Sequence, residues 1–372
     1  MKVLITGADG FVGKNLIAHL SERNDVEIVR FVRSDDADCL KHMVSDVDFI
    51  FHLAGVNRPL NVEEFKDGNT HLTQMLCEAV RGSGRPIPVL FTSSIQAEQS
   101  NPYGISKLGA EQTLRELERS HGSVVHLLRL PNVFGKWARP NYNSAVATFC
   151  HNISRDMPIQ INDPDACINL VYIDDVISYF IAAMEGRVSG GQYVDVKPVY
   201  SITVGALAEQ LKAFRSSRAS LVSEPVGTGL VRALYSTYVS YLAPEQFTYE
   251  VPKHGDPRGV FVEMLKTTDS GQFSYFTAHP GVTRGGHYHH SKTEKFLVIR
   301  GKACFRFRHI VSDEFYELFT TGENPVIVET VPGWTHDVTN VGGEEMIVML
   351  WANEIFDRER PDTYSMPVGA QA

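Results

Sequence analysis

The sequence predicts an α/β domain with a doubly wound parallel sheet, followed by a smaller all-β domain. The chain begins with a strand-like apolar run that leads directly into a glycine-rich turn and then into helix-forming residues. Strand-like and helix-like segments go on alternating, which is typical of a parallel sheet covered by helices on both faces. From Gly259 onward, short strand-like runs are separated by glycine turns, and few stretches have helical periodicity.

Length and composition restrict the classes of protein that this chain can belong to. A chain of 372 residues is too long for one compact core, and we predict domains at 1–243 and 244–372. The net charge of −9, without a cluster of lysine and arginine, argues against a nucleic-acid partner. Five scattered cysteines, no signal peptide and no apolar run of the ~20 residues that span a bilayer predict a cytoplasmic protein without membrane insertion.

The N-terminal glycines have the spacing of a dinucleotide-binding turn. Gly7 allows a tight turn after the strand Val3–Ile5, Gly10 lets backbone N–H groups approach a pyrophosphate, and Gly13 lets the helix pack closely. A glycine triplet alone is weak evidence, but this one directly follows a strand. The residues predicted to bind the cofactor are Gly7, Gly10, Phe11, Val12, Gly13, Arg33, Leu53, Ala54, Gly55, Tyr103 and Lys107.

The end of the second predicted strand, 26–32, indicates which nicotinamide cofactor is used. An acidic residue there would hold the ribose hydroxyls of NAD, whereas Arg33 can pair with the 2′-phosphate of NADP. The sequence therefore favours NADPH, the alternative being a solvated surface arginine. The third strand, 48–53, leads into Leu53-Ala54-Gly55, where small residues let a nucleotide lie against the sheet edge.

A tyrosine and a lysine near residue 105 are candidates for proton transfer. Pro102 suits the start of a helix, and Tyr103 and Lys107 are four residues apart, so their side chains share one helix face. An ammonium beside a phenol is expected to lower the tyrosine pKa from ~10, which favours proton exchange with a carbonyl or alcohol oxygen. Ser94 ends the preceding buried strand. Such a pair by itself is usually only a helix surface.

Five motifs in order resemble the extended short-chain dehydrogenase/reductases that act on nucleotide-linked sugars. The motifs are Gly7-x-x-Gly10-x-x-Gly13, Ser94, Tyr103-x-x-x-Lys107, Leu130-Pro131-Asn132-Val133-Phe134-Gly135 and Tyr172-Ile173-Asp174-Asp175-Val176. The resemblance covers roughly residues 1–240 and implies a Rossmann-type fold, the catalytic set Ser94, Tyr103 and Lys107, and a substrate contact at Asn132. Only eight residues separate Ser94 from Tyr103, fewer than in many relatives, so a more open active site is expected.

Two further asparagines, Asn141 and Asn143, are candidates for substrate binding. Both precede another helical pattern, so capping that helix is an equally good interpretation. Residues 216–257 are rich in aromatic residues and contain four prolines, and we interpret them as the crossing to the second domain, with the boundary near 244.

In the second domain, histidines and one glutamate have the spacing of a metal site. His287 and His289 are two apart and share a face on a strand, Glu294 follows, and His336 comes later. Imidazoles with one carboxylate suit a divalent transition metal with one open coordination position.

The pattern G-x5-H-x-H-x4-E-x6-G, with P-G-x-x-H downstream, resembles the cupins over about 260–360. The resemblance implies a cupin barrel with His287, His289, Glu294 and His336 as metal ligands. Zinc is favoured only by its abundance in such sites. The alternative is a histidine base without a metal, as in some sugar-epimerising cupins.

The reductase and cupin patterns are accompanied by Gly135-Lys136-Trp137, Pro140-Asn141-Tyr142-Asn143-Ser144, Glu294-Lys295-Phe296-Leu297-Val298 and Pro361-Asp362-Thr363-Tyr364. With these segments, nearly the whole chain resembles the bifunctional enzymes of capsular-polysaccharide and O-antigen synthesis, in which an extended short-chain reductase is fused to a cupin. The resemblance implies a UDP-linked 4-keto-6-deoxy-2-acetamido hexose as substrate. The cupin would epimerise C3 and the reductase would reduce C4. The product would be UDP-2-acetamido-2,6-dideoxy-L-talose, on the route to UDP-N-acetyl-L-fucosamine. A homodimer through the helices near 62–81 and 102–120 is expected.

Three alternatives remain open from the residues. One is a single-step reductase whose cupin only binds product or supports a dimer. Another is a redox sensor without activity, which the retained Ser94, Tyr103 and Lys107 disfavour. The third is a 4,6-dehydratase, which usually carries an acidic residue after the catalytic serine or threonine, where this chain has Ile95-Gln96.

Overall fold

The computed structural model describes residues 1–59, 61–188, 193, 195–251, 253–256, 259–262, 265–267, 271–354 and 359–369. The chain divides into two compact units. The first unit consists of Met1–Ser144 and Ile168–Ile202, and the second consists of Ala145–Cys167 and Thr203–Ala372. The domain boundary expected near residue 244 stays a prediction.

The first unit is built on a parallel five-stranded sheet in the order β2-β1-β3-β4-β5. This order confirms the predicted doubly wound α/β fold. It brings the carboxyl ends of β1, β3 and β4 to one edge, where ligands of such sheets bind. The strands are β1 Lys2–Thr6, β2 Glu27–Phe31, β3 Phe49–His52, β4 Val89–Ser94 and β5 Val125–Leu130.

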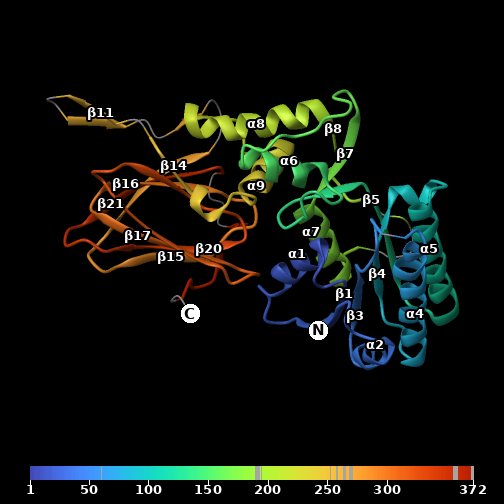
Figure 1. Cartoon of the computed structure of the whole chain (residues 1–372). Helices are drawn as coiled ribbons and strands as arrows, with labels where there is room; N and C mark the ends of the chain where they lie inside the picture. The colour runs from blue at the N-terminus through green and yellow to red at the C-terminus, as the bar shows by residue number, and fades with distance from the viewer. Residues whose placement is uncertain are drawn as a thin grey trace. The chain divides into compact units, whose positions relative to one another are not determined.

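Helices cover both faces of this sheet. Figure 1 shows α4 and α5 on one face and α1 and α7 on the other. The core between sheet and helices is apolar and closed to solvent, with Leu4, Ile50, Phe91, Leu76 and Leu114 all fully buried. The helices of this unit are α1 Phe11–Leu20, α2 Ala37–Val44, α3 Glu63–Phe65, α4 Leu72–Gly82, α5 Pro102–His121 and α7 Ile173–Met184.

The helix expected at 62–81 contains a π-helical segment, η1 Lys66–His71, between α3 and α4. The extra residue per turn places Asn69 inward, where it is 1 % exposed. A smaller sheet of the first unit joins β6 Asn132–Phe134, β7 Cys167–Tyr172 and β8 Tyr200–Thr203.

The second unit contains two five-stranded sheets, which we call the β-domain. Their orders are β10-β19-β16-β21-β14 and β18-β17-β20-β15-β22, and the all-β prediction is confirmed. The runs expected as strands at 272–278, 296–299, 303–308, 326–331 and 346–351 correspond to β14, β16, β17, β19 and β21, and β15 carries His287, which was placed on a strand. The other strands of these two sheets, β10, β18, β20 and β22, were not expected, and the expected run 260–266 lies partly outside the described residues. The bounds are β10 Thr248–Glu250, β14 Gln272–Ala278, β15 Thr283–Tyr288, β16 Glu294–Arg300, β17 Lys302–His309, β18 Phe315–Thr321, β19 Val326–Glu329, β20 Trp334–Asn340, β21 Met346–Ala352 and β22 Tyr364–Ser365.

Shorter strands and three helices complete the second unit. The strands are β9 Val222–Ser223, β11 Lys253–Asp256, β12 Gly259–Val262 and β13 Lys266–Thr267, and the helices are α6 Ala145–Ser154, α8 Val204–Ser220 and α9 Gly229–Val239. Helix α9 lies in the stretch interpreted from sequence as a crossing. Tyr235 and Tyr238 of this helix are both buried in the unit. The many aromatic residues of this stretch made its helical periodicity difficult to recognise from the sequence.

A buried ion cluster ties α8 and α9 to the β-domain. Glu329 on β19 forms an ion pair with Lys295 on β16, its register partner. The hydroxyl of Tyr235 on α9 donates to Glu329 Oε1 at 2.6 Å, and Arg218 on α8 lies 3.6 Å from Oε2. Because Lys295 and Glu329 are almost fully buried, removing either partner would leave an uncompensated charge in the interior.

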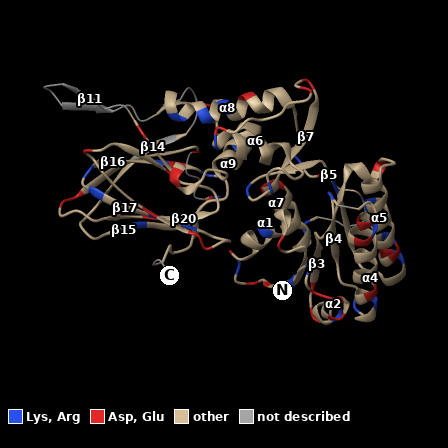
Figure 2. Cartoon of the chain, viewed as in Figure 1, with Lys and Arg blue, Asp and Glu red and all other residues tan. Residues whose placement is uncertain are grey.

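Charged residues of both signs are interspersed along the elements of each unit (Figure 2). Among the described residues, no helix combines the length and the apolar character needed to cross a bilayer.

Candidate active sites

The glycine turn of the first unit has the geometry of a phosphate cradle. Gly7 has a φ of +70°, and a Cβ there would lie 2.7 Å from the backbone nitrogen of Ala54. A Cβ on Gly13 would lie 2.3 Å from the carbonyl oxygen of Gly7. Helix α1 begins at Phe11 with no side-chain cap, so the N–H groups of its first turn remain for an anionic ligand.

Close packing joins this turn to the candidate catalytic lysine. A Cβ on Gly55 would lie 2.8 Å from Asn69 Oδ1 and 3.2 Å from Lys107 Nζ. Asn69 holds the same segment, accepting from Val56 N at 3.0 Å and donating to Val56 O at 3.0 Å. It also donates to Ser106 Oγ at 2.9 Å. The predicted cofactor segment 53–55 and the predicted catalytic helix are thus brought together through a residue that sequence reasoning missed.

Lys107 is held rigidly in a buried environment. Its Nζ donates to the carbonyl oxygen of Thr92 at 2.8 Å and lies 4.6 Å from the ring centroid of Phe91. Burial lowers the pKa of Lys107 to about 8, and the negative charge of Glu111, one turn further along α5, acts in the opposite direction. Lys107 therefore loses its proton more readily than an exposed lysine does.

Tyr103 and Ser94 interact directly. Burial raises the pKa of Tyr103, and the side-chain hydrogen bond with Ser94 lowers it by a smaller amount. The prediction that Lys107 lowers the tyrosine pKa is therefore wrong for this structure, because burial of the phenol dominates and the lysine ammonium is bonded to the Thr92 carbonyl. A phenol that keeps its proton at neutral pH suits a general acid in a reduction.

The short segment between Ser94 and Tyr103 is a compact turn. It forms the 3₁₀ helix η2 Ile95–Glu98, and Ser94 Oγ accepts from Gln96 N at 3.2 Å. Asn101 caps α5 by accepting from Gly104 N at 2.8 Å. A Cβ on Gly104 would lie 2.1 Å from the carbonyl oxygen of Gln96, so the helix start is pressed against this turn. The turn thereby fixes Tyr103 close to Ser94.

The residues predicted to select NADPH and to bind the sugar lie at exposed positions. Arg33 is exposed just beyond β2, and its role stays a prediction. Asn132 is exposed and donates to the carbonyl oxygen of Asn169 at 3.1 Å. Asn141 and Asn143 are exposed in the turn before α6. Their roles toward substrate stay predictions too.

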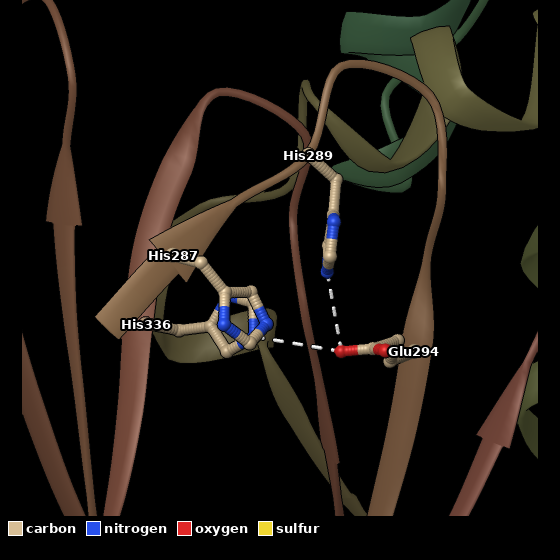
Figure 3. Close-up of side chains that lie close together, drawn as sticks. All are labelled: His287, His289, Glu294 and His336. Carbon is tan, nitrogen blue, oxygen red and sulfur yellow. Dashed lines mark hydrogen bonds and ion pairs between the residues drawn. The ribbon is translucent and has the colours of Figure 1, made fainter. Parts of the chain in front are cut away.

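In the β-domain, the four predicted metal ligands converge on one point. His287 and His336 are register partners on β15 and β20, and their ring centroids are 4.8 Å apart. Glu294 begins β16 of the facing sheet, and His289 lies in the loop between the sheets. One donor atom from each residue lies within 4.8 Å of the other three. Figure 3 shows the rings of His289 and His336 directed at the Glu294 carboxylate.

The spacing and charge of this cluster fit a divalent cation. Glu294 Oε2 lies 3.2 Å from His289 Nε2 and 3.5 Å from His336 Nε2. Ligand atoms at ~2.1 Å from a tetrahedral ion are roughly 3.4 Å apart. His336 is 4 % exposed, and both its ring nitrogens lack a hydrogen-bond partner within the described residues. Because nitrogen and carboxylate donors with buried, unsatisfied nitrogens suit a transition metal, the residues fit the implied ion.

The electrostatics keep the ligands in the protonation states that a metal needs. Burial, together with the charges of His336 and His289, lowers the pKa of His287 to about 3. Burial acts to raise the pKa of Glu294, but His289, His336 and Lys292 hold it well below its usual range. At neutral pH the site therefore offers a neutral imidazole at His287 and a carboxylate at Glu294.

Two further residues of the β-domain contact this cluster, and neither was predicted from sequence. Lys292 Nζ lies 3.0 Å from Glu294 Oε1. Asp362 lies far along the chain, and its carbonyl oxygen accepts from His289 Nδ1. Burial acts to raise the pKa of Asp362, but the charges of His289 and His290 and backbone N–H groups lower it to about 2. The Pro361-Asp362-Thr363-Tyr364 motif was noticed in the sequence, but nothing in its spacing indicated this contact.

Fold and site together define a class of protein. The chain belongs to the NAD dependent epimerase/dehydratase family, which matches residues 3–197. Residues 254–364 match the polysaccharide biosynthesis C-terminal domain. Membership of this family implies a nicotinamide cofactor for the glycine cradle of the first unit.

Particular relatives make the likeness specific. The chain is 64% identical over 372 residues, the full length of both proteins, to UDP-2-acetamido-2,6-beta-L-arabino-hexul-4-ose reductase of Pseudomonas aeruginosa. It is also similar to the crystal structure of the capsular polysaccharide assembling protein CapF from Staphylococcus aureus, with 41% identity, a TM-score of 0.69, and coverage of 99% of this chain and 100% of that one. The predicted resemblance to capsule-synthesis enzymes is confirmed.

A more distant structure shares only the fold of the first part. UDP-glucuronic acid 4-epimerase from Bacillus cereus is 20% identical, with a TM-score of 0.56, and the match covers 65% of this chain and 98% of that one.

Proposed function

We propose that this protein is a bifunctional enzyme of nucleotide-sugar metabolism. The β-domain epimerises C3 of a UDP-linked 4-keto-6-deoxy-2-acetamido hexose, and the first unit then reduces C4 with NADPH. The product is UDP-2-acetamido-2,6-dideoxy-L-talose, on the route to UDP-N-acetyl-L-fucosamine in capsule or O-antigen synthesis. The observation that carries the reductase is that Tyr103 interacts with the buried Ser94 on a helix whose buried Lys107 packs against segment 53–55 beside the glycine turn. The chain is also 64% identical to a UDP-sugar reductase.

The side chains of the first unit can carry out the proton chemistry of the reduction. When bound, NADPH supplies the hydride that reaches C4, which leaves NADP⁺. The phenol of Tyr103 donates its proton to the C4 oxygen, so the carbonyl becomes an alcohol. Ser94, whose Oγ already accepts from Gln96 N, directs its hydroxyl proton toward the same oxygen. Lys107 holds positive charge close by while the phenolate forms and is reprotonated.

The cluster in the β-domain supports the earlier step. The ketone at C4 makes the hydrogen on C3 acidic, so that removing this proton and returning it to the opposite face inverts C3. His287, His289, Glu294 and His336 would hold a divalent cation, which would supply Lewis-acid stabilisation of the negative charge that develops on the substrate. Zinc suits this donor set. Reduction of the epimer then draws the epimerisation forward.

The decisive experiment separates the two steps. The 4-keto substrate is incubated with the full-length protein in D2O without NADPH, and the sugar is examined by mass spectrometry. We expect one deuterium at C3, its loss in His287→Ala and Glu294→Gln, and its retention in Tyr103→Phe, which keeps the β-domain intact. When the epimerised ketone is supplied, wild type, His287→Ala and Glu294→Gln should all oxidise NADPH, and Tyr103→Phe should not.

A second candidate function is a single-step reductase whose β-domain binds product or supports a dimer. No deuterium at C3, together with normal NADPH consumption on the same ketone, would establish that function and reject the bifunctional one. The buried, unsatisfied nitrogens of His336 favour the bifunctional enzyme, since a purely structural cluster has no need for them.

A further inference from the structure

The segment around Asp362 is bonded closely to the loop 289–293, which carries the candidate ligand His289. The Asp362 carboxylate accepts from the backbone N–H groups of His290 at 2.8 Å, Ser291 at 2.7 Å and Lys292 at 2.6 Å. It also accepts from the Ser291 hydroxyl at 2.9 Å. Four donors of one loop therefore converge on a single side chain, which is separated from them by about 70 residues of sequence.

The backbone of the same residue acts on the metal ligand itself. The Nδ1–H of His289 donates to the carbonyl oxygen of Asp362. A neutral imidazole that donates through Nδ1 keeps its lone pair on Nε2. That nitrogen is the one directed at Glu294 Oε2, 3.2 Å away (Figure 3). Asp362 therefore sets both the position of the loop and the ring nitrogen, Nε2, that His289 directs at the cluster.

We propose that Asp362 is a positioning residue of the metal site, which holds loop 289–293 with its carboxylate and orients His289 with its carbonyl oxygen. This inference rests on the proposed binding of a divalent metal by the β-domain cluster. Outer partners that orient a ligating histidine typically contribute about 10- to 100-fold to metal affinity. An amide replaces the carboxylate only in part, because its NH₂ group would face either the three donors at Oδ2 or the His290 N–H at Oδ1.

The test compares metal retention in full-length variants. Wild-type protein, Asp362→Asn and the control Asp313→Asn are loaded with Zn²⁺, and release to a chromophoric chelator is timed. Asp313 is an exposed carboxylate that pairs with Arg308 in the same β-domain, at 2.9 Å. We expect release from Asp362→Asn to be about 10- to 100-fold faster than from the wild type, and unchanged release from Asp313→Asn.

A second readout separates positioning from a general loss of structure. Co²⁺ replaces Zn²⁺, and the d–d absorption bands report the ligand geometry; a merely structural role of Asp362 would change the melting temperature but leave these bands unchanged. Should Asp362→Asn fail to fold, Ser291→Ala removes one of the four donors and should still release metal faster than wild type.

The outcomes distinguish this inference from the function on which it rests. Equal release rates and identical Co²⁺ spectra for wild type and Asp362→Asn would overturn the inference alone. If the wild type holds no more metal than His289→Ala, the cluster does not bind a metal. The proposed metal-assisted epimerisation and this inference would then both be rejected.

Discussion

The two candidate sites differ in how their buried polar groups are satisfied. In the first unit, Lys107 donates to the Thr92 carbonyl at 2.8 Å. Both ring nitrogens of the neighbouring His52 are bonded at 2.8 Å, to Thr6 and Thr73. In the β-domain, His336 Nε2 makes only a long ion-pair contact, 3.5 Å from Glu294 Oε2, and in the part of the chain that the structure describes neither of its buried ring nitrogens makes a regular hydrogen bond.

This difference separates a preformed site from a site completed by its ligand. Burial lowers the pKa of His52 to about 3, so this histidine is a neutral, permanently bonded part of the sheet edge. An unsatisfied buried polar group costs about 1–3 kcal/mol. In the β-domain a bound ion would satisfy His336 better than its long ion-pair contact of 3.5 Å with Glu294 Oε2. We therefore expect the first unit to keep its geometry without cofactor and the β-domain to be stabilised by its ion.

The largest effect is expected from Tyr103→Phe. The substitution removes the proton donor but keeps the ring, whose centroid lies 5.7 Å from that of Phe65. Turnover of NADPH with the epimerised ketone should fall by about 10²- to 10⁴-fold. Tyr193→Phe, which removes a hydroxyl bonded to Glu111 at 3.0 Å in the same unit, is the control. An equal loss in both variants would show that Tyr103 acts through stability and not through its proton.

Removal of the metal should affect the β-domain alone. Binding at a metal concentration 100-fold above Kd stabilises a protein by about 2.7 kcal/mol. Chelator should therefore lower the unfolding temperature of the wild type and leave that of His287→Ala unchanged, as scanning calorimetry can measure. NADPH turnover of the epimerised ketone should stay constant throughout. If the chelator lowered this turnover and left the melting curve unchanged, the reductase site would be the one that depends on a metal, and the β-domain would not be stabilised by one.

Much of the first site could be predicted because its signals are local. The glycine turn, the strand ends and the pair Tyr103 and Lys107 lie within short stretches whose periodicity fixes their faces. The four candidate ligands of the β-domain were chosen from their spacing and from the resemblance to the cupins, and the structure brings their donor atoms together, although His289 lies just beyond the end of β15. Their role as metal ligands stays a prediction. Register pairing of His287 with His336 then followed from the fold.

What could not be predicted depends on contacts between distant segments. Asn69 acts because a π-helical segment turns it inward against 54–56, and no local pattern indicates such a segment. Asp362 reaches its loop from about 70 residues away. The pKa of Tyr103 was predicted with the wrong sign, because burial cannot be read from a four-residue spacing and in this structure it outweighs the neighbouring groups.

Arg33→Ala should weaken NADPH selectively if the first unit is the preformed site described above. A hydrogen bond to a charged group contributes about 1.5–3 kcal/mol, so KM for NADPH should rise by about 10- to 100-fold while KM for NADH stays unchanged. The control is Arg30→Ala, because Arg30 is already paired with Asp9. Equal changes in KM for NADPH and NADH would show that Arg33 does not bind the 2′-phosphate.

The smallest effect, and the finest test of the satisfied network, is expected from Glu111→Gln. The Glu111 carboxylate is 1 % exposed, accepts two hydrogen bonds from Arg129 at 3.0 and 2.7 Å, and raises the pKa of Lys107 against the lowering caused by burial. Without this charge the pKa of Lys107 falls further below about 8. The ammonium is then lost at lower pH, so the alkaline limb of the kcat profile should move down by about one pH unit or less.

Glu98→Gln is the matched control for that shift. Glu98 also accepts from Arg129, at 2.7 Å, but it is exposed and is not among the groups that perturb Lys107. If both variants lower kcat equally at every pH, Arg129 and its partners act only on stability. If the alkaline limb moves in Glu111→Gln alone, the charge of the Glu111 carboxylate sets the pH range of the reductase through the pKa of Lys107. The protein then fixes the electrostatics of this site as well as its geometry before the ligands bind.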